Sequence, residues 1–214
     1  MIVRKPQPHH DLFTRQKPYF NENDLESVIA ACISDDIRAQ RSLFQQFYGY
    51  GKSICLRYTA DAVEAEEILN EGFLKVFQNL SKYDPLQPFK AWLRTILVNT
   101  AISNYRKNRK YQANVNIDDV HEIGFEDSIL EQISAEEILQ IVQQLPAIYR
   151  TTFMMYVVDG YSHREIADAL SLNEATVRSN FSRARAKLQV MIRLSHPYLF
   201  PQDGNETTIR YNEN

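Results

Sequence analysis

Apolar side chains recur along this chain at spacings of three and four residues, the period of amphipathic helices. The longest such stretch, Phe89–Lys110, is apolar on two sides, so we expect a helix buried among its neighbours. Polar, aromatic and basic side chains interrupt this pattern along one edge only. They recur every three or four residues and therefore stack along the helix: Trp92, Thr95, Asn99, Ser103 and Arg106.

This edge has two interpretations. It can present an aromatic and basic surface to an anionic ligand, because residues 89–110 contain six Lys or Arg and no acid. It can equally be an ordinary solvated edge whose basic C-terminus suits the helix dipole. The pattern alone does not decide between them.

A second helix is predicted over residues 62–80, with Asp61 as N-cap and Glu64 closing a capping box. Its outer face is acidic. Such a face is either solvated or a docking surface for a basic partner. The residues on or beside it are Glu64, Glu66, Glu67, Asn70 and Glu71.

Later in the chain, the pattern predicts a helix that Gly160 ends as its C′ residue. Ser162 then caps a short helix, with Glu165 closing a capping box, and Asn173 caps a longer helix over residues 174–194. We expect the helix before Gly160 to bury an apolar face of Ile148, Phe153, Tyr156 and Val157.

These elements predict an all-α fold of two small helical domains, the second a helix-turn-helix (winged-helix-like) domain. We expect the first domain at residues 24–110 and the second at 135–195. An acidic linker over 111–134 joins them, and the flanking tails, 1–23 and 196–214, are polar and proline-containing.

Charge is strongly segregated although the net charge of the 214 residues is only −3. Residues 111–131 carry six acids and no Lys or Arg, whereas residues 176–193 carry five bases and no acid. Such asymmetry indicates charged partners. The N-terminus lacks the apolar core of a signal peptide and no apolar run is long enough for a membrane span, so we expect a cytoplasmic protein with no membrane partner.

Nothing in the sequence favours an enzyme, a metal site or a cofactor. Cys32 and Cys55 lack metal-ligand spacing and are expected to be buried thiols. No catalytic arrangement and no glycine-rich phosphate loop are present. Asp159 and His163 flank a turn, where we expect a capping or surface role.

The helix over residues 174–194 has the pattern of a DNA-reading helix. Val177, Phe181, Ala184, Leu188 and Met191 form its core seam, and small residues lie opposite at Ala175, Ser179, Ser182 and Ala186. Small side chains allow close approach to a groove floor, and flanking bases can reach the phosphates. The flanking bases are Arg178, Arg183, Arg185 and Lys187.

Three stretches together carry a resemblance to a known family: DAVEAEEILNEGFLKVF, PFKAWLRTILVNTAISNYRKNR and LPAIYRTTFMMYVVDGYSHREIADALSLNEATVRSNFSRARAKL. In order, spacing and length, the region from Asp24 to Leu194 resembles a bacterial RNA polymerase sigma factor of the extracytoplasmic-function subfamily. Such proteins carry the second and fourth conserved sigma regions joined by a linker.

The resemblance implies a protein that binds core RNA polymerase and directs it to promoters, with an anti-sigma factor as a further partner. It places polymerase contacts at Glu66, Glu67, Asn70 and Glu71. It places contacts to the melted minus-ten element at Lys82, Tyr83, Lys90, Trp92, Thr95, Asn99, Ser103, Arg106 and Lys107. Contacts to the minus-thirty-five duplex fall at Thr176, Arg178, Ser179, Ser182, Arg183, Arg185 and Lys187.

Three residues depart from the family pattern. Asn70 stands where Gln is usual, Ser103 where Asp is frequent, and Ser171 at a turn position that is often Gly. The alternative function is a helix-turn-helix regulator that binds duplex DNA without polymerase. That alternative leaves the basic, aromatic edge of the first domain and the acidic linker without a role.

Overall fold

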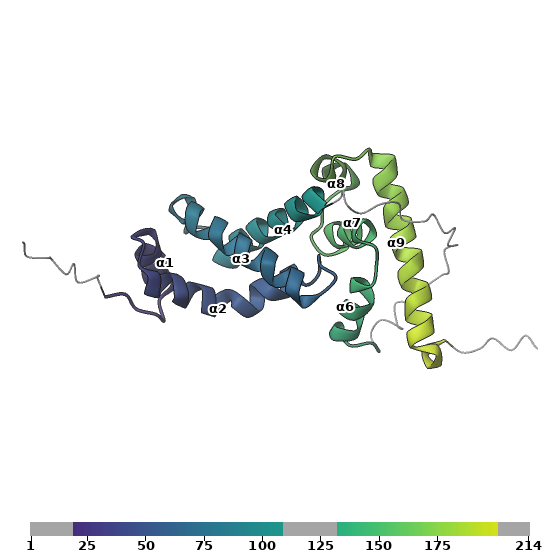
Figure 1. Cartoon of the computed structure of the whole chain (residues 1–214), viewed down its shortest axis with the longest axis horizontal. Helices are drawn as coiled ribbons and strands as arrows, with labels where there is room; N and C mark the ends of the chain where they lie inside the picture. The colour runs from purple at the N-terminus through teal and green to yellow at the C-terminus, as the bar shows by residue number, and fades with distance from the viewer. Residues whose placement is uncertain (1–18, 109–131, 201–214) are drawn as a thin grey trace, which may run out of the picture.

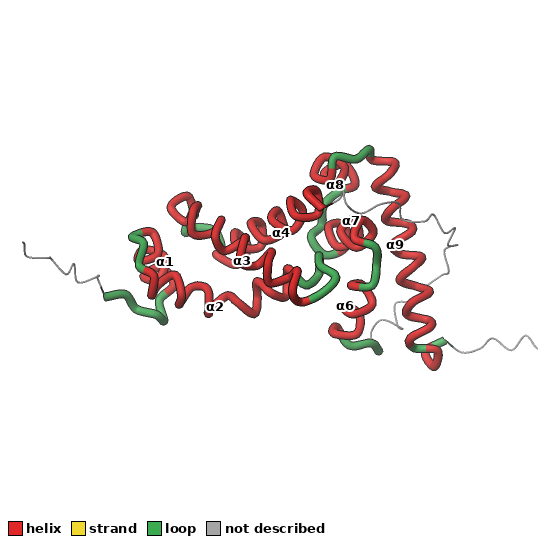
Figure 2. The backbone as a smooth tube through the Cα atoms, viewed as in Figure 1, coloured by secondary structure: helices red, strands yellow, loops and turns green. Residues whose placement is uncertain are grey.

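Aspartate side chains begin the first three helices by accepting hydrogen bonds from backbone N–H groups that have no partner within the helix. Asp24 begins α1 (Leu25–Ile33), Asp36 begins α2 (Ile37–Cys55), and Asp61 begins α3 (Ala62–Asn79). The computed structural model describes residues 19–108 and 132–200, and its regular elements within these ranges are all helices (Figure 2). The all-α prediction is therefore confirmed, and no β-wing occurs between residues 132 and 200.

Helix α4 (Phe89–Asn108) lies against α2 and α3 and completes the first core. Its two apolar sides are buried, as predicted, because neighbouring helices cover both of them. Gly72 on α3 permits the close approach of α4, since a Cβ atom there would collide with the side chain of Leu97. A short 3-10 helix, η1 (Leu80–Lys82), leads from α3 into the loop before α4.

The second half consists of α6 (Ala135–Gln143), α7 (Ala147–Val157), α8 (His163–Leu170), α9 (Glu174–Ser195) and the 3-10 helix η3 (Pro197–Leu199). The capping box of Ser162 and Glu165 is confirmed at the start of α8. Asn173 caps α9, also as predicted, by accepting a hydrogen bond from the Thr176 N–H. Helices α8 and α9 with the turn between them form the helix-turn-helix.

Two predicted helix ends differ in detail. Glu64 does not close a capping box with Asp61, because its carboxylate accepts a hydrogen bond from the Ala60 N–H. Gly160 has the left-handed φ of 75° expected near a helix end, but it is not the C′ residue. Helix α7 already ends at Val157, with Val158 as its C-cap, so Gly160 lies one position later than C′.

The predicted apolar face of α7 was wrong for two of its members. Tyr156 and Val157 are exposed, whereas Tyr149 and Met155 are buried. The helix is apolar around most of its circumference, so periodicity could not select the buried side. The expected tails also contain packed residues, because Phe20 and His196 are buried. The six predicted linker acids at 118, 119, 122, 126, 127 and 131 lie outside the described residues.

The two halves of the described chain contact each other. Helix α8 packs against α4, and the loop between α7 and α8 approaches the same helix (Figure 1). Since α9 follows α8 after a three-residue turn, the N-terminus of α9 lies one short helix away from α4.

Candidate nucleic-acid and polymerase interface

The polar edge of α4 is present in the structure and faces solvent along much of its length. Thr95, Asn99 and Arg106 are exposed, while Trp92 and Ser103 are half-buried. The two hydroxyl groups donate to carbonyl oxygens one turn earlier, Thr95 to Ala91 at 3.1 Å and Ser103 to Asn99 at 2.8 Å. The edge therefore presents the exposed amide of Asn99 and, two turns further along α4, the exposed guanidinium of Arg106.

Aromatic rings support Trp92 at the N-terminal end of that edge. Its ring centroid lies 5.2 Å from that of Tyr83 and 5.7 Å from that of Phe89. Phe89 in turn contacts Phe47 in the core, with 4.7 Å between centroids. The Tyr83 hydroxyl donates to the Gln87 carbonyl at 2.5 Å, which closes the loop before α4. The cluster therefore holds the indole as a partly exposed, rigid surface.

The basic residues predicted near this edge have intramolecular partners of different kinds. The Lys82 ammonium donates to the Asn79 side chain at 3.1 Å. Lys90 lies over the Tyr50 ring, 5.4 Å from its centroid. Lys107 lies 3.8 Å from the Glu71 carboxylate and is 70% exposed, so this weak contact leaves its charge accessible.

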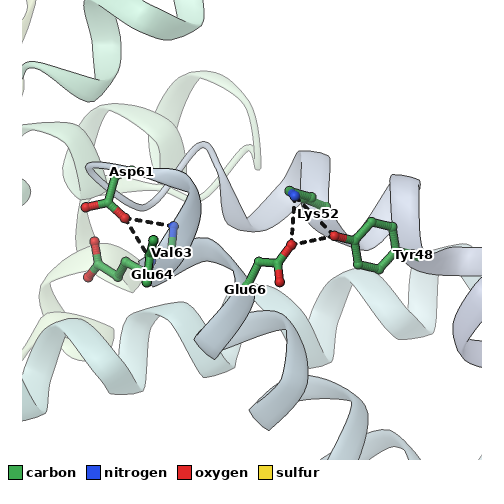
Figure 3. A network of polar contacts seen from close by, with 6 residues as sticks. All are labelled: Tyr48, Lys52, Asp61, Val63, Glu64 and Glu66. Atoms are coloured by element: carbon green, nitrogen blue, oxygen red, sulfur yellow. Dashed lines mark hydrogen bonds and ion pairs between the residues drawn. The ribbon is translucent and has the colours of Figure 1, made fainter.

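The acidic face of α3 separates into two kinds of residue. Glu66 points toward α2, where its carboxylate accepts hydrogen bonds from Lys52 at 2.8 Å and from Tyr48 at 2.5 Å (Figure 3). The Lys52 hydrogen bond is the main cause that lowers the pKa of Glu66. Glu71 pairs with Lys75 at 2.7 Å, which lowers the pKa of Glu71 in the same way.

Glu67 and Asn70 are exposed on the adjoining edge of α3. Two exposed apolar residues flank them at helical spacing, Val63 and Leu74, with 70% and 62% of their surface accessible. A stripe of apolar, acidic, amide and apolar side chains is therefore displayed to solvent. The sequence could have revealed this stripe, because its four residues follow one another at spacings of four, three and four, which places them on one side of a helix.

Helix α9 presents part of the predicted DNA face. Ala175, Ser182 and Arg185 are exposed, and Thr176, Ser179, Arg183 and Lys187 are half-buried. Arg178 forms an ion pair with Glu174 one turn earlier. Ala186 departs from the predicted exposed strip, because it is 1% exposed. The strip of small residues that reach the surface therefore runs from Ala175 to Ser182 and does not extend to Ala186.

Asp159 was wrongly expected to have a capping or surface role. Its side chain is 6% exposed and forms an ion pair with Arg94 on α4. The Tyr58 hydroxyl donates to the same carboxylate. Burial raises the pKa of Asp159 to about 6, against a lowering effect from Arg57. Nothing in the local sequence pattern indicated this contact.

Within the described ranges, no helix is both long and apolar enough to cross a membrane. The same residues contain no group of three His, Cys, Asp or Glu side chains that could hold a metal ion.

Comparisons with known proteins agree on one family. Residues 43–111 match the model of Sigma-70 region 2, and residues 135–188 match that of Sigma-70 region 4. RNA polymerase sigma-H factor of Pseudomonas aeruginosa is 30% identical over 145 residues, which cover 62% of this chain and 75% of that protein.

The extracytoplasmic-function sigma factor SigW of Bacillus subtilis is 26% identical over 152 residues, covering 65% of this chain and 81% of that protein. Among solved structures, sigma factor RpoE of Bartonella quintana, in complex with the anti-sigma factor NepR, is 21% identical with a TM-score of 0.43. That match covers 72% of this chain and 96% of the other. The two family models together span more than half of the sequence, and the chain belongs to the sigma-70 family, as an extracytoplasmic-function RNA polymerase sigma factor that acts in transcription initiation.

Proposed function

We propose that the surfaces of α3, α4 and α9 described above have three different binding roles in transcription initiation. The edge of α4 binds the non-template strand of the minus-ten element, the first turns of α9 read the minus-thirty-five element, and α3 docks on core RNA polymerase. In this division, residues 24–110 and 135–195 act as separate domains, and residues 111–134 connect them within the polymerase.

The α4 edge carries this proposal. Single-stranded nucleic acid needs aromatic surfaces on which bases stack and basic groups that follow the backbone. Trp92, supported by Tyr83 and Phe89, supplies the aromatic surface at one end. Asn99 and Arg106 supply an exposed amide and an exposed guanidinium further along the same edge. A simple duplex-binding regulator has no use for such an arrangement.

The α9 face fits duplex DNA in a different way. Exposed small residues in its first three turns, Ala175 and Ser182, allow the helix to approach the major-groove floor. Arg183, Arg185 and Lys187 are the residues proposed to contact phosphates, which contribute affinity but no direct sequence information. Thr176, Arg178 and Ser179 are the remaining candidates for base or phosphate contact. Before Arg178 can contact DNA, its pair with Glu174 must open.

Polymerase docking is assigned most strongly to Glu67 and Asn70. Their side chains are exposed between Val63 and Leu74, so the stripe offers a carboxylate and an amide between two apolar side chains, and protein interfaces combine apolar and polar contacts. Glu66 and Glu71 stay in the proposed surface, but both carboxylates already have intramolecular partners. A polymerase contact should therefore contribute less binding free energy at Glu66 or Glu71 than at Glu67.

The proposed activity is binding and promoter opening without covalent chemistry, in the cytoplasm with the polymerase. An anti-sigma factor is a further partner that the family resemblance implies. The second candidate function, a regulator acting without polymerase, is the one that the experiment must separate from the first.

The test is co-purification with core RNA polymerase, followed by run-off transcription on a promoter library. We expect core-dependent initiation at a defined set of promoters, and little sequence-specific duplex binding by the chain alone. Tight, specific duplex binding without any polymerase association would overturn the proposal in favour of the simple regulator.

A further inference from the structure

A pocket of about 420 Å³ lies between α6, α7 and α9 in the second half of the described chain. Helices α6 and α7 both pack against α9 (Figure 1). Nine residues give α6 a length of about 14 Å, whereas the 22 residues of α9 span about 33 Å. The short helix therefore cannot cover the whole apolar side of α9, and part of that side lines the pocket.

The lining of this pocket is mostly apolar. Helix α6 contributes Ile141 and Val142, α7 contributes Met154 and Val157, and α9 contributes Ile192. Val157 is 53% exposed, so the pocket opens to solvent on its side. Small-molecule sites have volumes of about 300–1,000 Å³ and apolar walls with a few polar groups that orient the ligand. The pocket therefore has the size and the lining of a site for a small, largely apolar ligand.

Arg185 on α9 is the charged residue of this lining, and its side chain is exposed. No acid is among the described residues that line the pocket. Within the described ranges, the Arg185 guanidinium has no ion pair, whereas that of Arg178 pairs with Glu174. Gln189 also lines the pocket, but it is 5% exposed and interacts within the chain. A guanidinium beside apolar walls fits a carboxylate, which it can bind through two parallel hydrogen bonds.

We propose that this pocket binds an amphipathic carboxylate of the size of a medium-chain fatty acid. The hydrocarbon chain lies among α6, α7 and α9, and the carboxylate accepts hydrogen bonds from the Arg185 guanidinium. The class of ligand follows from the lining, which combines one exposed positive charge with apolar side chains.

Arg185 also connects the pocket to the DNA face of α9. Among the residues of the proposed minus-thirty-five surface, it is the one that lines the pocket. Exposed Ser182 lies three residues earlier, on the same side of the helix. A carboxylate bound to Arg185 neutralises a charge beside the DNA, so the ligand should weaken minus-thirty-five binding. This consequence rests on the function proposed above, whereas ligand binding by the free chain does not.

The test is isothermal titration calorimetry of the full chain with octanoate, decanoate and dodecanoate, each below its micelle-forming concentration. We expect one ligand per chain. The affinity should rise about fourfold with each added methylene group until the pocket is full, because burial of each group contributes a constant free energy. Decan-1-ol has the chain length of decanoate without its charge and should bind about tenfold more weakly, because it lacks the charge-assisted hydrogen bonds.

Two variants assign the binding to Arg185 and to the pocket. Arg185→Gln should lower the affinity for decanoate about tenfold and leave that for decan-1-ol unchanged, because it removes the charge. Its matched control is Arg183→Gln, the same change on α9 at a position outside the pocket lining. Val157→Trp should abolish binding of both ligands by filling the pocket. Because Val157 is 53% exposed, the melting temperature of this variant should stay at the wild-type value.

Equal wild-type affinities for decanoate and decan-1-ol would overturn the carboxylate assignment, as would an unchanged decanoate affinity in Arg185→Gln. Several ligands per chain, or binding that survives Val157→Trp, would overturn the pocket as the site. The pocket can also receive a segment of another protein. Absence of decanoate binding, together with weaker binding of Val157→Trp to core polymerase, would show that occupant and overturn the ligand site.

The link to DNA is measured in the complex with core polymerase. Saturating decanoate should reduce the magnitude of the slope of log promoter affinity against log salt concentration by about 0.9, the effect of one lost phosphate contact. It should have no such effect with Arg185→Gln. An unchanged slope in the wild type would overturn the link to DNA. Failure of the chain to bind core polymerase would contradict the proposed function instead, since calorimetry on the free chain tests the pocket separately.

Discussion

Lys52 on α2 and Glu66 on α3 form an ion pair of 2.8 Å, and Tyr48 donates to the same carboxylate (Figure 3). This pair joins two helices of the first core at the edge of the acidic face. Glu66 and its neighbour Glu67 are adjacent in sequence, yet one has partners within the chain and the other faces solvent. The two residues should therefore respond differently to substitution.

Glu67→Ala should weaken binding to core polymerase by about tenfold, the effect of losing roughly 1.4 kcal/mol at an interface. Its melting temperature should stay at the wild-type value, because the side chain is exposed. Glu66→Ala should instead lower the melting temperature slightly and affect polymerase binding less. Fluorescence anisotropy with labelled chain and thermal melts measure both effects. A larger binding loss in Glu66→Ala than in Glu67→Ala would contradict the assignment of the docking stripe.

Arg183→Ala should weaken promoter binding fairly evenly across sequences, because a phosphate contact carries no direct sequence information. The slope of log affinity against log salt concentration should fall in magnitude by about 0.9. Titrations of the polymerase complex with duplex promoter at several salt concentrations give this slope. Arg41→Ala, at an exposed position of α2, serves as the control with an unchanged slope. An unaltered slope in Arg183→Ala would mean that this side chain does not contact phosphate.

Ser171 and Gly160 both have positive φ, so opposite substitutions at the two positions test the cost of this backbone conformation. Ser171 has φ 54° and ψ 52° between α8 and α9, a left-handed conformation that is costly for a residue with a Cβ atom. Ser171→Gly should raise the free energy of unfolding by about 0.5–1 kcal/mol. Gly160→Ala should lower it by about 1 kcal/mol, because φ is 75° there although no atom would obstruct the new Cβ. Urea unfolding measures both, and the same sign for the two variants would contradict this explanation.

Local features of the fold could be predicted from the sequence because the relevant interactions lie within a few residues. The caps Asp61, Ser162 and Asn173 and the buried sides of α4 follow from spacing alone. The left-handed turn at Ser171 was indicated in another way, by the family resemblance, in which this turn position is often Gly.

Contacts between distant segments could not be predicted in this way. Arg94 and Asp159 lie 65 positions apart, and each looks like an ordinary surface residue in its own segment. The pairing of Glu66 with Lys52 likewise requires the packing of α2 on α3. Ala186 is buried because other segments cover that side of α9, and helical periodicity gives no information about which segments those are. The sequence thus indicated which surfaces carry chemistry, and the structure showed which of their side chains have partners already.

The most direct test concerns the minus-ten surface of α4. Asn99→Ala is the cleanest variant, since Asn99 is exposed and outside the aromatic cluster, whereas Trp92 packs against Tyr83 and Phe89. Permanganate reactivity of the minus-ten thymines is measured in the promoter complex with core polymerase. With the wild-type chain we expect strong reactivity that requires both core polymerase and this chain. Asn99→Ala should keep duplex binding near the wild-type level and reduce that reactivity several-fold. Full reactivity with Asn99→Ala would contradict the role of this edge, and no reactivity with the wild-type chain at any promoter it binds would contradict promoter opening itself.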